Sequence, residues 1–350
     1  MPEKDFYTVL IITRFDRGDI MIRVAINGFG RIGRQVLQAG FKEKGIQWVA
    51  VNDLTDTKTL AHLLKYDSVY GRFQGKVSST DKSLIIDGKE ILVFAEKDPM
   101  NLPWKKLKID VVVESTGFFT KREGAELHLK AGAKKVLISA PAKNPDITVV
   151  KGVNEHLYDK KKHNIISNAS CTTNCAAPML KALNDAFGID QGFMVTVHAY
   201  TATQKLVDAP ADDLRRARAA AVNIVPTTTG AATAVIDVIP ELKGKIDGMA
   251  IRVPVIDGSF AQFSARLKKP ATVEQINKAF KEVSQKKMKG IIEYTEEPLV
   301  STDVIKNSSS CVFDSLATTM TGDRFVSIGG WYDNEWGYSC RMVDIIKILL

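Results

Sequence analysis

Short apolar runs and stretches of helical periodicity alternate along the first half of the chain. A β-branched run over 22–27 precedes a glycine-rich turn, a helical pattern over 32–43 and a second apolar run over 47–52. Strands buried on both faces are continuously apolar, so this order predicts two parallel strands joined by a crossover helix. The pattern continues with strands expected over 110–114 and 135–139, a helix over 121–131 and a hairpin over 85–95 around Asp87-Gly88.

The second half of the chain has a different pattern. A long helix is expected over 172–187, followed by a run over 193–199 that alternates apolar and polar positions like a half-buried strand. Residues 200–225 are polar and rich in arginine, which indicates a long functional loop. The remaining predicted elements are strands over 248–255 and 259–267, a hairpin turn between them at Asp257-Gly258, and an amphipathic helix over 334–350.

The composition narrows the class of protein. The 350 residues are 45% hydrophobic and 25% charged, which excludes a disordered chain, a collagen-like repeat and a disulfide-stapled miniprotein. No stretch approaches 18 uncharged apolar residues, so we expect no membrane span. The four cysteines form no paired framework, which is typical of a reducing compartment, and we expect a cytoplasmic protein.

The net charge of +8 does not come from the start of the chain. Residues 1–20 carry a net charge of −1, so the rest of the chain carries +9. A basic surplus is compatible with nucleic acid, a membrane surface or small anionic ligands. Residues 1–20 are a poor secretory signal, and we expect them to be a dispensable extension, because Met21 directly precedes the first convincing strand.

The first candidate site is a glycine turn. Gly28, Gly30 and Gly33 have the G-x-G-x-x-G spacing between a predicted strand and a predicted helix. Glycines allow a tight turn and close approach of a pyrophosphate to the helix N-terminus. Asp53 lies 20 residues after Gly33 at the end of the next strand, where a carboxylate would bind ribose hydroxyls. The same charge repels a 2′-phosphate, which favours NAD over NADP.

These patterns predict an α/β protein with two domains. The first is a Rossmann-type parallel-sheet nucleotide-binding domain that begins at Met21 and ends at residue 170. The second is an α+β catalytic domain over 171–333 with a mainly antiparallel sheet.

The second candidate site is a thiol. Cys171 is expected at the start of a helix beside the hydroxyls of Ser170 and Thr172, where the helix dipole would lower its pKa. Cys175 lies one turn later, and we interpret it as a buried thiol. His198 opens the polar loop and could form a thiolate–imidazolium pair with a nearby cysteine. No second Cys/His pair has ligand spacing, so we expect no metal.

A third group of residues could bind anions. The helical run after Gly230 could receive a phosphate at its N-terminus. The arginines of this group could instead belong to a solvated loop or form a contact between subunits. The members are Thr201, Thr203, Arg215, Arg216, Arg218, the threonines at 227–229, Gly230 and Arg252.

With these residues in place, the chain closely resembles the phosphorylating glyceraldehyde-3-phosphate dehydrogenase family. The resemblance runs from Met21 to about Ile346, and its motifs in this order are highly specific. The matching segments are 26–34 (INGFGRIGR), 114–117 (ESTG), 167–175 (SNASCTTNC), 198–204 (HAYTATQ) and 331–339 (WYDNEWGYS).

The resemblance implies a reaction. Cys171 corresponds to the nucleophile that forms a hemithioacetal with glyceraldehyde 3-phosphate, and His198 to its base. Oxidation with NAD would give a thioester, which inorganic phosphate would attack to release 1,3-bisphosphoglycerate. The covalent step conserves oxidation energy that hydrolysis would dissipate. The family is usually a homotetramer. The resemblance also implies that the C-terminal helix at 334–350 returns to the nucleotide-binding domain formed by 21–170.

The resemblance also implies binding residues. Thr201 and Arg252 correspond to substrate-phosphate contacts, with Arg216 as the third member and Arg215 as the alternative. The attacking phosphate would bind at Ser170, Thr172, Thr229 and Gly230. The cofactor would contact Arg31 and Ile32 at the glycine turn, Asp53 at the adenosine ribose, and Ser139 and Asn334 at the nicotinamide.

Two alternatives remain open from the sequence. Erythrose-4-phosphate dehydrogenase shares the fold, the cysteine and the histidine. The Asn-Asp-Leu sequence at 52–54 and the Thr-Thr-Thr-Gly-Ala-Ala run at 227–232 argue against it. A basic surface-binding protein, for nucleic acid or adhesion, is the other class, but no aromatic-studded basic stripe supports it and no nucleic acid is required.

Overall fold

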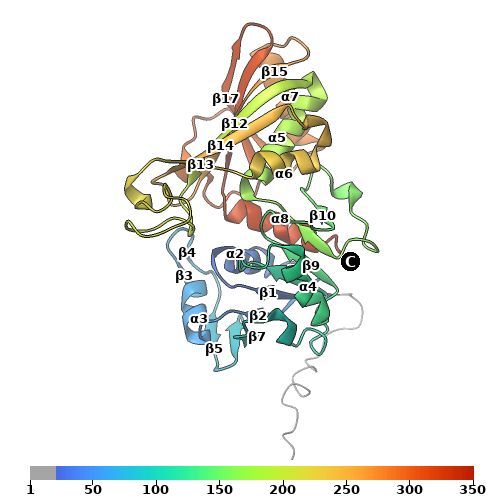
Figure 1. Cartoon of the computed structure of the whole chain (residues 1–350), viewed down its shortest axis with the longest axis vertical. Coiled ribbons are helices and arrows are strands. Elements are labelled where there is room, and N and C mark those ends of the chain that lie inside the picture. Colours follow the sequence, from blue (N-terminus) through green and yellow to red (C-terminus); the bar gives the residue numbers. More distant parts are fainter. Residues whose placement is uncertain (1–20) are drawn as a thin grey trace, which may run out of the picture.

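The computed structural model describes residues 21–350, and the predicted extension at 1–20 lies outside them. The chain forms two lobes stacked along the long axis (Figure 1). One contains a nine-stranded sheet and is called the parallel-sheet lobe; the other contains a seven-stranded sheet and is called the mixed-sheet lobe. Within the described residues, no helix is both long enough and apolar enough to span a bilayer.

The parallel-sheet lobe follows the predicted strand–helix–strand order. Its strands run in the order β10-β11-β9-β8-β1-β2-β7-β6-β5, and the pairs from β10 to β7 are parallel. The strands are β1 (Ile22–Asn27), β2 (Ile46–Asn52), β5 (Val77–Ser79), β6 (Ser83–Ile86), β7 (Lys89–Phe94), β8 (Val111–Glu114), β9 (Lys135–Ile138), β10 (Ile147–Thr148) and β11 (Ile165–Ser167).

Both faces of this sheet are buried, which explains why its central strands are continuously apolar. Val24 and Ile26 of β1 face one core, and Ala25 between them faces another. The predicted hairpin at Asp87-Gly88 is confirmed, because β6 and β7 pair antiparallel and both turn residues have positive φ. The helices of this lobe are α2 (Arg31–Gly40), α3 (Thr57–Lys65) and α4 (Arg122–Lys130).

The mixed-sheet lobe has the order β13-β14-β12-β15-β18-β17-β16, and four of its six strand pairs are antiparallel. Three helices, α5, α6 and α7, pack against the sheet around one apolar core. The elements are α5 (Cys171–Phe187), β12 (Ile189–Ala199), β13 (Val225–Thr228), α6 (Ala231–Val238), β14 (Ile246–Val253), β15 (Ser259–Leu267), α7 (Val273–Gln285), β16 (Ile292–Thr295), β17 (Cys311–Thr321) and β18 (Phe325–Tyr332).

The hairpin predicted at Asp257-Gly258 is wrong. β12 lies between β14 and β15, pairing parallel with β14 and antiparallel with β15. Gly258 has φ +84°, and a Cβ there would lie 2.2 Å from Ser301 O, so the Asp-Gly pair marks a crowded connection between strands that are not neighbours.

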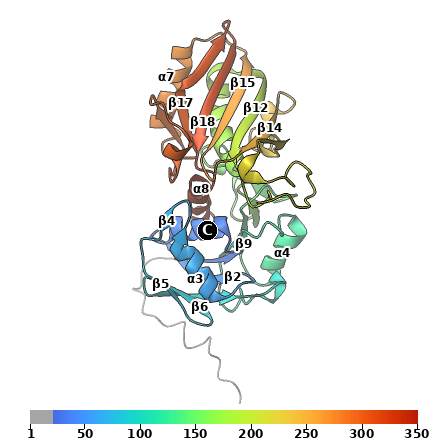
Figure 2. The same ribbon diagram turned by 90° about the vertical axis from the view of Figure 1, so that its left-hand side faces the viewer.

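The C-terminal helix α8 (Trp336–Ile346) lies between the lobes (Figure 2). It is shorter than the predicted 334–350. Tyr338, Met342 and Val343 belong to the same apolar core as β1 and α2. A Cβ added to Gly40 of α2 would lie 3.1 Å from Val343, so the last helix packs closely on the first one of the parallel-sheet lobe.

Candidate active site

The glycine turn connects β1 to α2 and is tightly packed on one side. Gly28 has φ +89°, and a Cβ there would lie 2.6 Å from Thr116 N. A Cβ at Gly33 would lie 2.1 Å from Gly28 O. At Gly30, by contrast, no atom of the described chain lies within 4 Å of the added Cβ. Gly28 and Gly33 therefore close the turn, and Gly30 leaves room for a ligand beside the N-terminus of α2.

Asp53 follows β2 and turns its carboxylate toward this loop. Its Oδ2 accepts a hydrogen bond from Phe29 N at 2.8 Å, and Oδ1 lies 3.3 Å from Thr55 N. The half-buried carboxylate is thereby fixed next to the glycine turn. The spare acceptor positions of a carboxylate fit the adjacent hydroxyls of a ribose, so the loop, the open space at Gly30 and Asp53 together fit a dinucleotide.

Arg31 and Ile32 form the first turn of α2. The guanidinium of Arg31 does not point to the glycine turn but pairs with Asp67 and Glu335. Burial opposes its charge, yet the hydrogen bonds and charges of the two acids outweigh burial and raise the pKa of Arg31. The first N–H groups of a helix have no partner inside it, so backbone N–H groups are what Arg31 and Ile32 can offer a pyrophosphate.

Two residues predicted for the nicotinamide end come from separate elements. Ser139 follows β9, and its hydroxyl donates to Glu114 O at 3.0 Å. Asn334 lies between β18 and α8, where its Oδ1 accepts from Ser259 Oγ at 2.6 Å. This hydrogen bond fixes the orientation of the buried Asn334 amide and leaves its NH₂ group to donate elsewhere.

The predicted thiol and imidazole meet. Cys171 is the first residue of α5, and its Sγ lies 3.4 Å from His198 Nε2 near the end of β12. Ser170 caps the helix, since its Oγ accepts from Thr173 N at 3.0 Å. The thiol and the imidazole are therefore within hydrogen-bond reach of each other, as covalent catalysis through a thiol would require.

Arg252 completes this group from β14. Its Nη1 lies 2.7 Å from His198 Nδ1 and donates to Ala199 O at 2.9 Å. The same carbonyl lies 2.7 Å from His198 Nδ1. An arginine N–H can only donate, so the contacts of Nδ1 with Arg252 and with Ala199 O require opposite tautomers of His198. In the tautomer whose Nδ1 donates to Ala199 O, the lone pair of Nε2 faces the sulfur and can accept the thiol proton.

The expected low pKa of the thiol is wrong for the free protein. Burial raises the pKa of Cys171, although the charge of Arg252 and the hydrogen bonds of Thr172 oppose this. Burial, and then Arg252, lowers the pKa of His198 to about 3. Desolvation outweighs the helix dipole, so the resting pair is a neutral thiol and a neutral imidazole.

The candidate anion groups lie beside this pair. The charge of Arg216 helps to lower the pKa of Arg252, after burial, so the two guanidinium groups are close. Arg216 Nε donates to Thr227 Oγ1 at 3.0 Å, whereas the exposed Arg215 points to Pro226 O at 3.4 Å. This geometry favours Arg216 over Arg215.

Thr201 is half-buried at the start of the polar loop, with its Oγ1 2.9 Å from Thr203 Oγ1. Gly230 precedes α6, and a Cβ there would meet no described atom within 4 Å. Thr229 Oγ1 accepts from Ala231 N at 3.1 Å. The Thr172 hydroxyl lies 2.9 Å from Tyr332 OH in the core, so we expect its backbone N–H to be the main group that it offers a phosphate.

Comparison with known proteins identifies the family. The model for the NAD binding domain of glyceraldehyde 3-phosphate dehydrogenase matches residues 22–122, and that for its C-terminal domain matches residues 170–334. The chain belongs to the glyceraldehyde-3-phosphate dehydrogenase family. It is an oxidoreductase of the α/β class, and NAD is its cofactor.

Several curated relatives share most of the chain. The glyceraldehyde-3-phosphate dehydrogenase of Thermotoga maritima is 59% identical over 94% of this chain and 99% of its own length. That of Geobacillus stearothermophilus is 57% identical over 93% and 97%, and that of Streptomyces coelicolor is 55% identical over 93% and 97%. These names favour neither the erythrose-4-phosphate alternative nor the surface-binding one.

Sequence reasoning missed three members of the site of this dehydrogenase. Tyr332 OH bridges Thr172 Oγ1 and Thr196 Oγ1, at 2.9 and 2.8 Å, beneath the thiol. Ser259 donates to Asn334, and the carbonyl of Ala199 accepts beside His198. Tyr332 and Ala199 lie within the matching segments 331–339 and 198–204, which were their only signal, and Ser259 had none.

Proposed function

We propose that the chain oxidises D-glyceraldehyde 3-phosphate with NAD and inorganic phosphate to 1,3-bisphosphoglycerate, a glycolytic and gluconeogenic reaction. The observation that carries this proposal is the 3.4 Å approach of Cys171 Sγ to His198 Nε2 beside the half-buried Arg252. Family membership supports the substrate, and the geometry supports covalent catalysis through the thiol.

Substrate binding uses the two arginines. The buried Nε of Arg252 has no hydrogen-bond partner among the described residues. A buried N–H without a partner is costly, so it marks a position that a ligand acceptor can fill. The substrate phosphate would bind between Arg252, Arg216 and Thr201, and would partly neutralise the positive charge that opposes protonation of His198.

The first chemical step is proton transfer from Cys171 to Nε2 of His198. The thiolate attacks the aldehyde carbon, and the imidazolium returns its proton to the carbonyl oxygen, which gives a hemithioacetal. His198 then accepts that hydroxyl proton while the C–H electron pair departs as hydride. NAD supplies the hydride acceptor when it is bound. Cys171 is left as a thioester.

The second step releases the product. A phosphate oxygen attacks the thioester carbon, the C–S bond breaks, and Cys171 leaves as a thiolate. Ser170, Thr229 and the N–H groups near Gly230 and Thr172 would hold the attacking phosphate. Their position at the start of α5 and α6 favours an anion.

The proposed assembly is a homotetramer in the cytoplasm. Exposed apolar side chains gather in the polar loop, where a second copy could cover them. These exposed apolar residues of the loop are Leu206, Val207, Leu214, Val222 and Ile224. The four cysteines are free thiols, which fits a reducing compartment. Light scattering of the purified protein should give four times the chain mass, and a monomer would contradict the assembly.

The domain division is also part of the proposal. Residues 21–170 and 334–350 would bind the cofactor and residues 171–333 the substrate. The packing of α8 against β1 and α2 supports the return of the C-terminus to the nucleotide-binding domain. Residues 1–20 would be dispensable, and a chain beginning at Met21 should keep full activity.

The test is steady-state formation of NADH from glyceraldehyde 3-phosphate with and without inorganic phosphate. Cys171→Ser should lower turnover by at least about 10³-fold with NAD affinity unchanged. Cys340→Ser is the matched control, because Cys340 is a half-buried thiol on α8.

Without phosphate, formation of NADH should stop at one equivalent per site. Sustained turnover without phosphate, or an active Cys171→Ser, would refute the mechanism, and preference for erythrose 4-phosphate would refute the substrate.

A further inference from the structure

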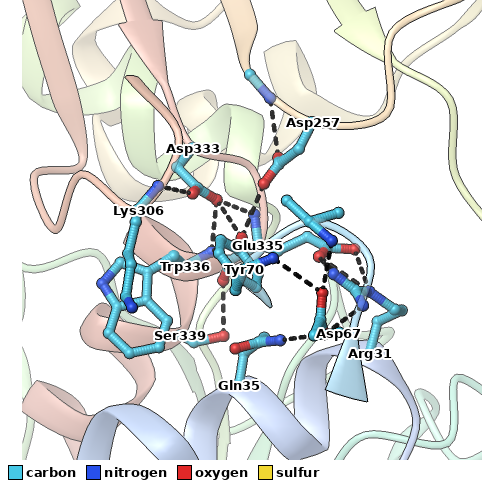
Figure 3. Close-up of polar contacts among 12 residues, drawn as sticks. Arg31, Gln35, Asp67, Tyr70, Asp257, Lys306, Asp333, Glu335, Trp336 and Ser339 are labelled. Carbon is cyan, nitrogen blue, oxygen red and sulfur yellow. Dashed lines mark hydrogen bonds and ion pairs between the residues drawn. The ribbon is translucent and has the colours of Figure 1, made fainter. Parts of the chain in front are cut away.

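Tyr70 joins the two lobes through one hydroxyl group. It lies in the turn of a small hairpin formed by β3 (Tyr66–Asp67) and β4 (Gly71–Arg72). Its phenol oxygen is 2.8 Å from Asp257 Oδ2 and 2.8 Å from Asp333 Oδ1. Figure 3 shows how Tyr70 lies between these two residues. Asp257 precedes β15 and Asp333 follows β18, so a residue of the parallel-sheet lobe contacts two carboxyl groups at one end of the mixed sheet.

The two carboxyl groups are not equivalent. Asp333 accepts hydrogen bonds from several backbone N–H groups, which is the environment of an ionised carboxylate. Asp257 is fully buried and accepts, among the described backbone groups, only from Gly258 N at 2.9 Å. The donors to Asp333 are the N–H groups of Lys306, Glu335 and Trp336.

A count of protons then determines the direction of the hydrogen bonds. A phenol has one proton and can donate to only one of two carboxylates. Because Asp333 has the environment of the anion, Tyr70 donates to Asp333. Asp257 must then carry a proton of its own and donate it to the Tyr70 oxygen. This count gives the order of donation Asp257 to Tyr70 to Asp333, and the Tyr70 oxygen also accepts from Trp336 N at 3.1 Å.

The surrounding charges agree with a proton on Asp257. Burial, and then the charge of Asp333, raises the pKa of Asp257 to about 8, and Glu335 contributes in the same direction. Hydrogen bonds from Tyr70 and Gly258 N to the ionised carboxylate oppose this rise but do not outweigh it. The guanidinium of Arg31, with its Cζ 5.8 Å from the Tyr70 ring centroid, is paired with Asp67 and Glu335. The other charged or titratable groups that face the cluster are Lys306, with Nζ 5.7 Å from the Trp336 ring centroid, and Cys171, whose pKa an ionised Asp257 would raise.

This chain of hydrogen bonds flanks the cofactor site. Asn334 directly follows Asp333, and Ser259, which donates to Asn334 Oδ1, lies two residues after Asp257. Ser259 Oγ also accepts from Ala199 N at 3.1 Å, next to His198. Tyr70 therefore contacts Asp257, close to Ser259 in sequence, and Asp333, next to Asn334. It binds both segments that supply the Ser259–Asn334 hydrogen bond.

We propose that Tyr70, together with a proton carried on Asp257, is a positioning residue that fixes Asn334 for the nicotinamide end of NAD. Loss of that proton leaves two carboxylates on one phenol, which separates the hairpin from the end of the mixed sheet and loosens Asn334. This inference rests on the proposed role of Asn334 in cofactor binding.

The first experiment is NAD binding to the full chain by isothermal titration at neutral pH, paired with steady-state kinetics. Tyr70→Phe should raise the NAD dissociation constant about tenfold, the expected effect of losing a hydrogen bond to a charged group. Turnover at saturating NAD should change less than about threefold, because the reacting groups stay in place. Tyr158→Phe is the matched control, since it removes a half-buried hydroxyl that donates to Leu349 O and should leave NAD affinity unchanged. Wild-type affinity in Tyr70→Phe would overturn the inference.

The second experiment measures the pH dependence of NAD binding, which needs no turnover. The affinity of the unmodified chain should fall about tenfold from pH 7 to pH 9, as Asp257 loses its proton around pH 8. Asp257→Asn should keep the neutral-pH affinity and remove this fall, because an amide donates to Tyr70 without titrating. An equal fall in Asp257→Asn would overturn the role of Asp257.

A third variant separates this inference from the proposed function. Asn334→Ala should weaken NAD binding if Asn334 contacts the cofactor. Unchanged NAD binding in Asn334→Ala would refute that proposed role. If Asn334→Ala weakens NAD binding while Tyr70→Phe keeps the affinity of the unmodified chain, only the positioning role of Tyr70 is refuted. Urea unfolding of each variant shows whether a loss of affinity reflects a loss of fold.

Discussion

Arg252 and His198 lie opposite each other in register on the parallel strands β14 and β12, with Arg252 Nη1 2.7 Å from His198 Nδ1. A fixed positive charge thus stands behind the imidazole and near the thiol. This charge opposes protonation of His198, as burial does. It also favours ionisation of Cys171, which burial opposes. This one guanidinium therefore couples the acid–base state of the catalytic pair to occupancy of the proposed phosphate site.

Replacing Arg252 should make the thiol less reactive. In Arg252→Gln the charge that favours the thiolate is lost, so the pKa of Cys171 should rise and that of His198 should rise as well. We expect alkylation of Cys171 by iodoacetamide at pH 7 to slow about tenfold, which corresponds to one pKa unit. The profile of alkylation rate against pH measures this shift. Arg218→Gln, an exposed arginine paired with Asp208, should leave the profile unchanged; an unchanged profile in Arg252→Gln contradicts the coupling.

Two neighbouring glycines should respond differently to alanine. Gly33→Ala places a Cβ 2.1 Å from Gly28 O and should lower the free energy of unfolding by about 1–3 kcal/mol. Gly30→Ala meets no described atom and should leave stability within about 0.5 kcal/mol, yet weaken NAD binding by filling ligand space. Urea unfolding and NAD titration measure the two effects. Equal stability losses would contradict this assignment of the turn.

Asp53 should control the choice of cofactor. Removing its charge in Asp53→Asn removes the repulsion of a 2′-phosphate while keeping an acceptor for Phe29 N. We expect the ratio of kcat/KM for NAD to that for NADP to fall about tenfold or more. Asp56→Asn, which changes an exposed helix cap on the following loop, is the control and should keep the ratio. An unchanged ratio in Asp53→Asn would show that another residue discriminates.

His128 should matter for stability and not for chemistry. It is fully buried, and its Nδ1 accepts from Trp104 Nε1 at 3.0 Å, so Nε2 carries the proton and lies 3.1 Å from Glu114 Oε2. His128→Leu leaves buried polar groups without partners and should lower the free energy of unfolding by about 2–4 kcal/mol. Urea unfolding measures this loss, and the exposed His62→Leu should cost less than about 0.5 kcal/mol. Little change in His128→Leu would mean that water replaces the imidazole.

Local pattern was enough to predict most elements of the fold. The strand at Ile22–Asn27 and the helix that begins at Cys171 follow from apolar runs, periodicity and capping hydroxyls, all of which act over a few residues. The Asp257-Gly258 hairpin failed for the opposite reason. A turn signal shows that the chain bends, but it cannot show that β12, more than fifty residues earlier, separates the two strands.

The sequence by itself was enough to propose which residues carry the chemistry, because the glycine turn, Asp53, Cys171 and His198 occur in a specific order and spacing. Only the tertiary structure decided how they act. Burial reversed the expected pKa shift of Cys171, register placed Arg252 behind His198, and a turn in the other lobe brought Tyr70 to Asp257. Desolvation and hydrogen bonding depend on which distant segments surround a side chain, and that information exists only once the chain has folded.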